Sequence, residues 1–212
     1  MKYKCIIFDC DGVIVDSESI SNLTLIEMAK TVGVILTEAF VMNHFLGKSL
    51  AFCFQYIQDQ SAEKLPDNFE AEFRERTFHA FKTQLQPIPG IHELLDKIEI
   101  DFCVASNGPR DKIKLNLTTV KLIDKFEDKI FSAYDINSWK PNPELYLHAA
   151  KTMGYAIEEC VVIEDSPAGV QAALAGGFAV FGYLNSHNKN EFSKINIPVF
   201  EDMKNLDNLL SE

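Results

Sequence analysis

Short apolar runs recur along the chain, and helical periodicity fills the stretches between them. Apolar, β-branched runs without polar alternation are typical of strands buried on both faces. Strands that alternate with helices predict a parallel sheet with right-handed crossovers. We therefore predict an α/β fold with a Rossmann-like parallel sheet flanked by helices. The predicted strands are Cys5–Phe8, Phe102–Ala105, Lys129–Ala133, Cys160–Ile163 and Phe178–Phe181, with an edge strand near Val199.

Residues 17–84 differ from the rest because they carry helical periodicity and no strand pattern. Asp16 and Ser17 are suited to cap the first helix of this block. Phenylalanines at helical spacing along its last helix are typical of a packed core. We predict that residues 1–16 and 85–212 form the Rossmann-like core and that residues 17–84 form an inserted all-helical cap. The cap helices are predicted over 18–32, 37–45, 50–58 and 69–84, the last with Phe69, Phe73, Phe78 and Phe81.

The composition narrows the class of protein. The chain has 212 residues, 47% of them hydrophobic, which is typical of a globular protein with a core. A net charge of −11 argues against binding to nucleic acid or to an anionic membrane. The sequence has no signal-peptide pattern and no apolar stretch suited to span a membrane. Its five scattered cysteines show no metal-type pairing, so we expect a reduced, cytoplasmic protein.

The first strand ends in two aspartates and a glycine. Asp9 and Asp11 would point into the crevice where open α/β sheets bind ligands. Two neighbouring carboxylates repel each other, so they favour a cation between them or a shared proton. Gly12 lets the turn present backbone N–H groups to an anion. Taken alone, the motif is equally consistent with an ordinary Asp-rich turn.

Polar residues of complementary chemistry follow three further predicted strands. The carboxyl ends of parallel strands converge on one crevice, so these side chains are expected to meet Asp9 there. The acidic residues supply the hard oxygens that Mg²⁺ prefers, and the others supply donors and a positive charge for a phosphate group. The residues are Ser106 and Asn107, then Lys140, then Glu164 and Asp165.

Together these motifs resemble those of the haloacid dehalogenase superfamily, in particular its phosphatases of the β-phosphoglucomutase-like kind. The family's first motif matches Asp9–Ser17, and its second is a serine at a strand end, here Ser106. The third is Lys140–Pro141 and the fourth is Glu164–Gly169. The resemblance spans nearly the whole chain and makes residues 17–84 the counterpart of the family's helical cap.

The resemblance implies a role for each core residue. Asp9 is the expected nucleophile, which forms an aspartyl-phosphate. Asp11 is the expected general acid and base, and its backbone carbonyl is expected on the metal. Asp165 is the expected side-chain ligand of Mg²⁺, and Glu164 either joins it or holds a metal-bound water. Lys140 is expected to neutralise charge as the nucleophile meets the phosphate.

The resemblance also implies substrate contacts. Backbone N–H groups near Asp11 and Gly12, with Ser106 and Asn107, are expected to hold the phosphate. In the cap, Lys48 stands near the place of an arginine that binds a second phosphate in phosphosugar mutases. Lys48 is therefore either a substrate contact or an ordinary exposed lysine. His44, close by, is interpreted as structural.

The expected activity is hydrolysis of a small phosphorylated metabolite, most simply a sugar phosphate. Segments around Ser106 and Lys140 resemble those of family members that hydrolyse 6-phosphogluconate, a candidate substrate. Dehalogenases of the superfamily lack an acid two positions after the nucleophile, so Asp11 favours phosphoryl chemistry. A β-phosphoglucomutase-type mutase is a second reading, although residues 19–22 lack the family's mutase histidine. A non-enzymatic phospho-acceptor or binding domain is a third, and Asp11 counts against it.

Overall fold

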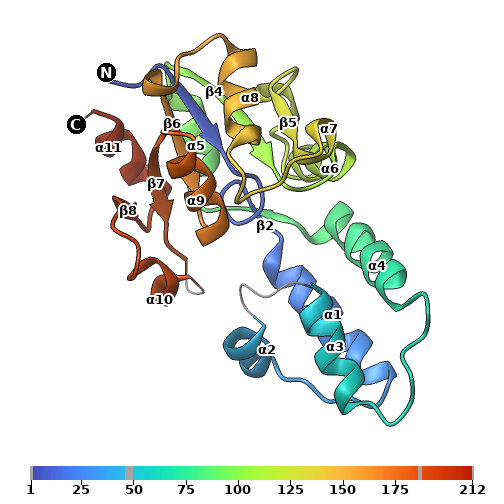
Figure 1. Cartoon of the computed structure of the whole chain (residues 1–212). Helices are drawn as coiled ribbons and strands as arrows, with labels where there is room; N and C mark the ends of the chain where they lie inside the picture. Colours follow the sequence, from blue (N-terminus) through green and yellow to red (C-terminus); the bar gives the residue numbers. More distant parts are fainter. Residues whose placement is uncertain (1, 46–49, 186–187, 212) are drawn as a thin grey trace. The chain divides into compact units, whose positions relative to one another are not determined.

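The computed structural model describes residues 2–45, 50–185 and 188–211, and these divide into two compact units. Unit 1 is Met1–Asp16 with Gln86–Glu212, and unit 2 is Ser17–Leu85. The chain therefore passes out of unit 1 after Asp16 and returns to it at Gln86 (Figure 1).

Unit 1 is built on a six-stranded parallel sheet with strand order β5-β4-β1-β6-β7-β8. β1 lies inside the sheet, where Cys5 pairs with Asp101 on one side and with Cys160 on the other. The predicted α/β fold with a Rossmann-like parallel sheet is confirmed, including the edge strand near Val199. The strands are β1 (Cys5–Phe8), β4 (Asp101–Ser106), β5 (Ile130–Ser132), β6 (Cys160–Glu164), β7 (Ala179–Tyr183) and β8 (Val199–Phe200).

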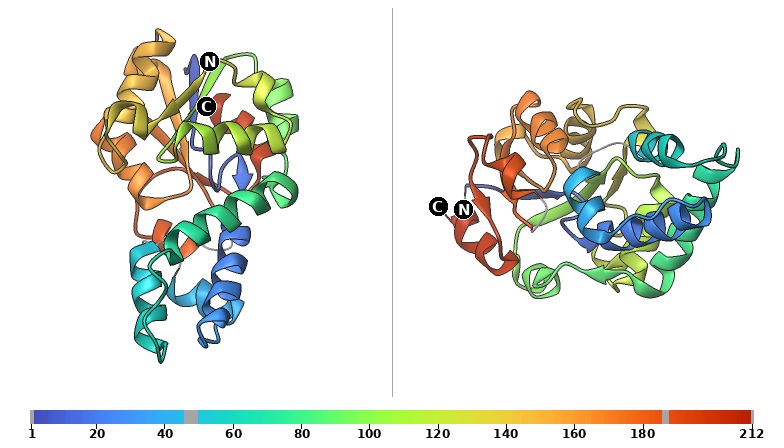
Figure 2. Two further views of the ribbon diagram at one scale, coloured as in Figure 1. Left: turned by 90° about the vertical axis from the view of Figure 1, so that its right-hand side faces the viewer. Right: turned by 90° about the horizontal axis from the view of Figure 1, so that it is seen from below.

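Helices cover both faces of this sheet (Figure 2). The strand order and right-handed crossovers place α5 and α6 on one face and α8 and α9 on the other. On the second face, Cys5 and Ile7 of β1 pack in one core cluster with buried residues of α8 and α9. The helices of unit 1 are α5 (Ile91–Lys97), α6 (Arg110–Thr119), α7 (Ala133–Ile136), α8 (Glu144–Met153), α9 (Pro167–Ala175), α10 (Lys189–Phe192) and α11 (Leu206–Ser211).

A short antiparallel ribbon joins the two crossings of the chain between the units. β2 (Val15–Asp16) pairs with β3 (Gln86–Pro87), and the N–H of Ile88 donates to the carbonyl of Ile14 at 2.9 Å. The sequence did not predict this ribbon, because two-residue strands that include a proline carry no periodicity.

Unit 2 packs its helices around a core of its own. Buried residues from Leu25 on the first helix to Phe73 on the last form one cluster. Phe69, Phe73 and Phe81 are buried as predicted, but Phe78 is 38% exposed, so the phenylalanine stripe is incomplete. The helices are α1 (Glu18–Thr31), α2 (Glu38–His44), α3 (Leu50–Gln60) and α4 (Phe69–Gln84).

The two predicted caps in unit 2 have different outcomes. Thr37 caps α2, because its side chain accepts a hydrogen bond from the N–H of Phe40. Ser17 occupies the N-cap position of α1 but, within the described residues, its side chain makes no capping hydrogen bond. Its backbone is helical (φ −90°, ψ −15°), whereas a capping side chain needs an extended backbone to reach forward. Ser17 therefore holds the predicted N-cap position, but the predicted capping hydrogen bond to its side chain was wrong.

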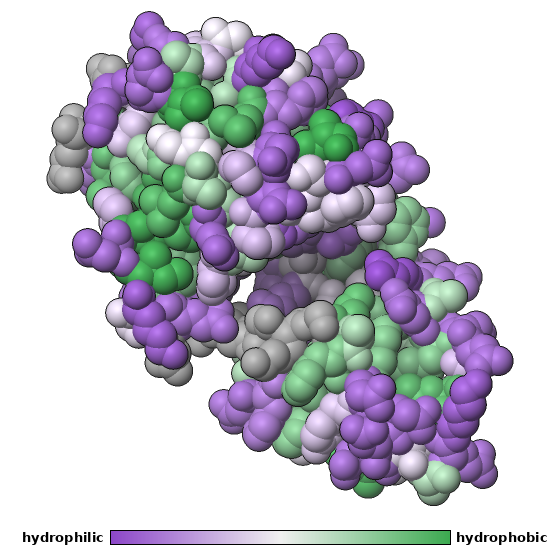
Figure 3. All heavy atoms as spheres, in the orientation of Figure 1, coloured by the Kyte–Doolittle hydropathy of each residue, from purple (hydrophilic) through white to green (hydrophobic). Residues whose placement is uncertain are grey.

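On the face shown in Figure 3, hydrophilic residues are spread over both units, and hydrophobic areas lie among these residues. Over the described ranges, no helix has the length and apolar character needed to cross a membrane.

Candidate active site

Asp9 stands directly after β1, and its backbone is fixed to the neighbouring strand. Its N–H donates to the carbonyl of Ile163 in β6 at 2.9 Å, and the residue is buried. Because β1 lies between β4 and β6, Asp9 comes close to the ends of both neighbours. The sheet topology therefore brings together residues that are more than a hundred positions apart in the sequence.

Lys140 reaches this strand end from the loop before α8. Its ammonium group donates to Asp9, to Oε1 of Glu164 at 2.7 Å and to the carbonyl of Ala105 at 3.0 Å. All three N–H donors of the ammonium group are thus used within the described structure. Burial alone would lower the pKa of Lys140, but the two carboxylates outweigh it and raise the pKa. The lysine is therefore a fixed cation that stays charged beside the Asp9 carboxylate.

Asp9 has an unusual ionisation behaviour for an aspartate. Burial raises its pKa to about 7, while Lys140 acts in the opposite direction. The nearby carboxylates of Glu164 and Asp11 add to the increase. The Asp9 carboxyl group is therefore held close to its protonation point at neutral pH.

Glu164 is fully buried, and both of its carboxylate oxygens are occupied. Oε1 accepts a hydrogen bond from the hydroxyl of Tyr146 at 2.7 Å, besides that from Lys140. Oε2 accepts from the N–H and the hydroxyl of Ser166 at 3.0 and 2.9 Å. Burial alone would raise the pKa of Glu164, but Lys140 and these hydrogen bonds lower it. Glu164 therefore stays ionised.

Steric crowding explains why the motif Glu164–Gly169 ends in glycine. A Cβ added at Gly169 would lie 1.8 Å from Oε1 of Glu164, which cannot move because it is hydrogen-bonded on every side. The first turn of α9 therefore closes over the glutamate only with glycine at this position.

Asp165 lies beside the first motif. A Cβ at Gly12, where φ is +85°, would lie 1.9 Å from Oδ2 of Asp165. The side chain of Asn188 donates to the backbone carbonyl of Asp165 at 2.7 Å and to that of Tyr183 at 2.9 Å. Asn185 donates to Oδ2 of Asp165 at 3.4 Å.

The carboxylates of Asp9, Glu164 and Asp165 offer oxygen atoms that all lie within 4.8 Å of one another. Oxygen donors of this kind and spacing suit a small hard cation such as Mg²⁺. Three of the four residues predicted to bind the metal, Asp9, Glu164 and Asp165, thus lie together, and their chemistry suits such a cation. The predicted contact of the Asp11 backbone carbonyl with the metal remains a prediction.

Asp11 is held by two residues that the sequence analysis did not single out. Lys112 donates from Nζ to Oδ2 of Asp11 at 2.8 Å, and Asn116 donates from Nδ2 to Oδ1 at 3.2 Å. Both lie on α6. Burial would lower the pKa of Lys112, but Asp11 outweighs it and raises the pKa. The sequence signal that could have identified Lys112 and Asn116 is that both are polar residues on a helix that begins just after Ser106 and Asn107.

The side-chain amide of Asn107 forms hydrogen bonds with both the N–H and the carbonyl of the Lys140 backbone. Its Oδ1 accepts from the N–H of Lys140 at 2.9 Å, and its Nδ2 donates to the carbonyl of Lys140 at 3.3 Å. The side chain therefore positions the lysine in this structure. The hydroxyl of Ser106 accepts from the N–H of Gly108 at 3.0 Å. The predicted phosphate contacts of Ser106, Asn107 and Gly12 remain predictions.

The cap residues named from the sequence have separate outcomes. Lys48 lies outside the described residues. His44 ends α2 and stacks on Phe40 with a ring separation of 4.1 Å, and its Nδ1 lies 3.0 Å from the carbonyl of Phe40. These contacts within one helix support its interpretation as a structural residue.

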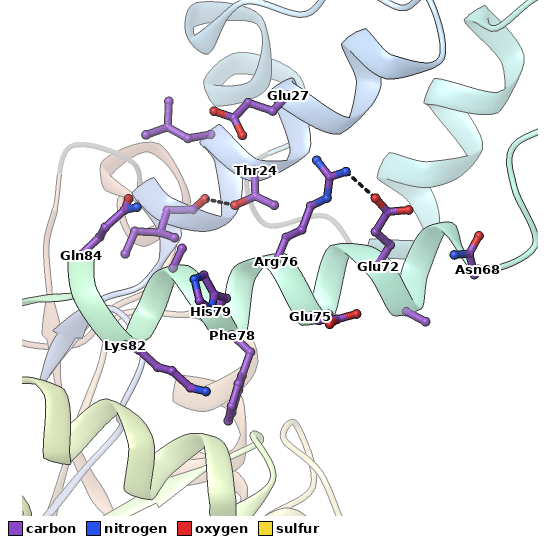
Figure 4. A pocket seen from close by; sticks show the side chains of 14 residues that line it. Thr24, Glu27, Asn68, Glu72, Glu75, Arg76, Phe78, His79, Lys82 and Gln84 are labelled. Carbon is purple, nitrogen blue, oxygen red and sulfur yellow. Dashed lines mark hydrogen bonds and ion pairs between the residues drawn. The ribbon is translucent and has the colours of Figure 1, made fainter.

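Unit 2 also contains a cavity of about 930 Å³ between α1 and α4 (Figure 4). Glu27 reaches it from α1, and Glu72, Arg76 and His79 from α4. Arg76 and Glu72 form an ion pair there. Charges of both signs line the cavity, so its composition indicates no single class of ligand.

Comparison with known proteins gives consistent matches along the chain. The sequence pattern of haloacid dehalogenase-like hydrolases matches residues 6–183. The 6-phosphogluconate phosphatase of Escherichia coli is 35% identical over 191 residues, which cover 89% of this chain and 86% of that protein. Hexitol phosphatase A of Escherichia coli is 30% identical over 185 residues, covering 84% of this chain and 81% of that protein.

Solved structures agree with the fold. A haloacid dehalogenase family hydrolase from Deinococcus radiodurans, crystallised with bound phosphate and sodium, superimposes with a TM-score of 0.85. It is 26% identical, and the match covers 99% of this chain and 96% of that chain. Both units thus have counterparts in a single protein that binds phosphate.

Proposed function

The chain belongs to the haloacid dehalogenase-like hydrolase family, and from this we propose that it hydrolyses a phosphomonoester of a small, sugar-type metabolite. Family membership and the phosphatase-named relatives confirm the predicted class of enzyme. The mechanism, the metal and the substrate below are our proposals. The supporting observation is that the buried Lys140 pairs with two members of the acidic cluster, Asp9 and Glu164, whereas Asp11 pairs with a different lysine, Lys112.

In the first half-reaction, an oxygen of the Asp9 carboxylate attacks phosphorus and the bond to the alcohol oxygen breaks. The electron pair of that bond goes to the departing oxygen, which takes a proton from the carboxyl group of Asp11. The products are an aspartyl-phosphate on Asp9 and the free alcohol. Lys140 offsets negative charge as the anionic groups meet.

In the second half-reaction, the Asp11 carboxylate takes a proton from water as the water oxygen attacks phosphorus. The bond between phosphorus and the Asp9 oxygen breaks, which releases inorganic phosphate and restores the carboxylate. Asp11 thus ends each cycle protonated and ready for the next. A haloalkane substrate would need no such proton, so Asp11 favours the phosphatase reading.

We propose Mg²⁺ as the cofactor, held by the side chains of Asp9 and Asp165 and the backbone carbonyl of Asp11, with Glu164 beside them. When bound, it would screen the phosphate charge from the nucleophile. Glu164 already accepts hydrogen bonds from Lys140, Tyr146 and Ser166. We therefore propose that it mainly orients Lys140 and supports the cluster.

We assign the substrate-selecting role to unit 2, as a cap. 6-Phosphogluconate is the candidate substrate, and hexitol phosphates form the next class to test, since two relatives are named for these compounds. The five free, buried cysteines are consistent with our proposal of a reducing, cytoplasmic location.

The test is phosphate release with and without Mg²⁺ across 6-phosphogluconate, hexitol phosphates and hexose 1- and 6-phosphates. Asp9→Asn should lower release by about 10³-fold or more, because the amide cannot act as the nucleophile. Asp128→Asn is the matched control, since Asp128 is an exposed turn residue with φ of +59°, which asparagine adopts readily.

Mg²⁺-dependent release that the Asp9 variant loses would support the proposal. Conversion of hexose 1-phosphate to hexose 6-phosphate without net release would replace it with a mutase. A chain that is inactive in both assays but is phosphorylated on Asp9 by a small phosphodonor would be a phospho-acceptor.

A further inference from the structure

We propose that Lys112 and Asn116 are positioning residues that hold the Asp11 carboxylate in the orientation its acid and base roles require. The inference rests on the proposed function, because Asp11 has those roles only in a phosphatase. Neither residue belongs to the motifs from which the family resemblance was drawn.

The side chains of Lys112 and Asn116 donate hydrogen bonds to different oxygens of the Asp11 carboxylate. Lys112 donates to Oδ2 and Asn116 to Oδ1, at 2.8 and 3.2 Å. Rotation of the Asp11 carboxylate about its Cβ–Cγ bond would break at least one of these contacts. The two residues are four positions apart on α6, so they lie on the same face of the helix. One rigid element therefore fixes the plane of the carboxylate.

Stability does not explain the amide at position 116. Asn116 is fully buried, and its Oδ1 accepts no hydrogen bond from any described residue. A buried acceptor without a partner destabilises the fold, whereas an apolar side chain of similar size would pack there without that penalty. The hydrogen bond from Asn116 to Asp11 instead explains why an amide occupies this position.

The positive charge of Lys112 also acts on Asp11. The acidic cluster beside Asp11 repels its carboxylate, and Lys140 directs its three donors to Asp9, Glu164 and Ala105. A second cation beside Asp11 would stabilise the ionised form in which Asp11 acts as the base. Lys112 supplies that charge from a part-buried position, where it is less screened by water than a surface lysine would be.

The start of α6 also ties Asp11 to the proposed phosphate site. Ser106, Gly108 and the first turn of α6 form one continuous segment. It is braced by hydrogen bonds from the N–H of Gly108 to Ser106 and from the hydroxyl of Ser132 to the carbonyl of Gly108. The same segment would thus set the phosphate and the acid–base group relative to each other. A displacement of about 1 Å in such a pair costs roughly 100-fold in rate.

An aryl phosphate separates the two half-reactions. p-Nitrophenolate leaves without a proton, so formation of the aspartyl-phosphate from p-nitrophenyl phosphate needs little help from Asp11. Hydrolysis of the aspartyl-phosphate still needs Asp11 as a base. Loss of positioning should therefore slow the second step and spare the first.

The experiment is rapid-mixing kinetics of Lys112→Met and Asn116→Leu with p-nitrophenyl phosphate and Mg²⁺. We expect a burst of p-nitrophenolate within about threefold of the wild-type rate and a kcat lowered roughly 10- to 100-fold. Acid-quenched samples should contain accumulated aspartyl-phosphate. Asn116→Leu should melt at or above the wild-type temperature, because it removes the unpaired buried oxygen.

Lys112→Arg should restore much of the activity, and Lys114→Met, an exposed neighbour on the same helix, should match the wild type. Equal loss of burst and kcat, a wild-type kcat in both variants, or a loss that tracks lower stability would overturn the inference. A wild-type protein without phosphatase activity would instead overturn the proposed function on which it rests.

Discussion

The hydroxyl of Tyr146 donates to Oε1 of Glu164 at 2.7 Å, the same oxygen that accepts from Lys140. The lysine ammonium group also lies 4.9 Å from the centre of the Tyr146 ring. Tyr146 therefore supports both members of the buried ion pair, with its hydroxyl on the anion and its ring on the cation. It is fully buried, so no water replaces either contact.

Tyr146→Phe should lower the free energy of unfolding by about 1.5–3 kcal/mol, because a buried carboxylate loses a hydrogen bond while its charge remains. Urea titration measures the change. Tyr134→Phe is the control, since Tyr134 is 51% exposed and should change stability by less than about 0.5 kcal/mol. If both substitutions changed the free energy of unfolding equally, the hydrogen bond from Tyr146 to Glu164 would not contribute to stability.

The raised pKa of Asp9 links metal binding to pH. With a pKa of about 7, Asp9 is mostly protonated at pH 6 in the metal-free protein and must lose its proton before its oxygen can bind a cation. Mg²⁺ affinity should therefore rise by up to about tenfold per pH unit below pH 7 and level off above it.

Calorimetry of Mg²⁺ binding in two buffers of different ionisation enthalpy measures the protons released. We expect nearly one proton per Mg²⁺ at pH 6 and almost none at pH 8.5. Asp9→Asn should remove the dependence. An affinity that stays constant from pH 5.5 to 8.5 in the wild type would contradict the role of Asp9.

Gly12→Ala should disrupt the acidic cluster, whereas Gly154→Ala should not. Both glycines have positive φ, +85° and +83°, so each substitution costs about 1–2 kcal/mol of backbone strain. A Cβ at Gly154 meets no atom within 4 Å, but one at Gly12 displaces the Asp165 carboxylate. Stability should therefore fall in both variants, and Mg²⁺ affinity, measured by calorimetry, should fall only in Gly12→Ala.

Asn188→Ala should weaken Mg²⁺ binding by about 10-fold, in the usual range for residues that orient a metal ligand. The change removes the donor that fixes the backbone carbonyl of Asp165. Mg²⁺-induced thermal shifts measure the effect, with the exposed Asn205→Ala as the control. A wild-type response of the Asn188 variant would show that Asp165 is held without it.

The sequence predicted the sheet and its convergent strand ends because both follow from short-range patterns. Buried β-branched runs identify strands, and parallel topology then brings Asp9, Lys140 and Glu164 together. Tyr146 could not be foreseen in the same way, because a tyrosine on an amphipathic helix is read as core. Its partner depends on which helix crosses which strand.

Lys112 and Asn116 were missed for a related reason. Polar residues on a helix are usually solvated, and only the fold brings this face of α6 to Asp11 in the turn after β1. The capping error at Ser17 has another source, since residue type favours a cap but the local backbone angles decide whether the side chain can reach.

The interior position of β1 has a consequence for how the protein is made. Cys5 pairs with Asp101 and with Cys160, so β1 is synthesised before its sheet neighbours, and both of its edges are paired only after residue 160 has been made. Unit 2, by contrast, is one continuous segment that can fold as soon as it emerges. An apolar strand with open edges is a template for pairing with other chains, so slow translation between residues 17 and 160 should favour aggregation of the nascent protein.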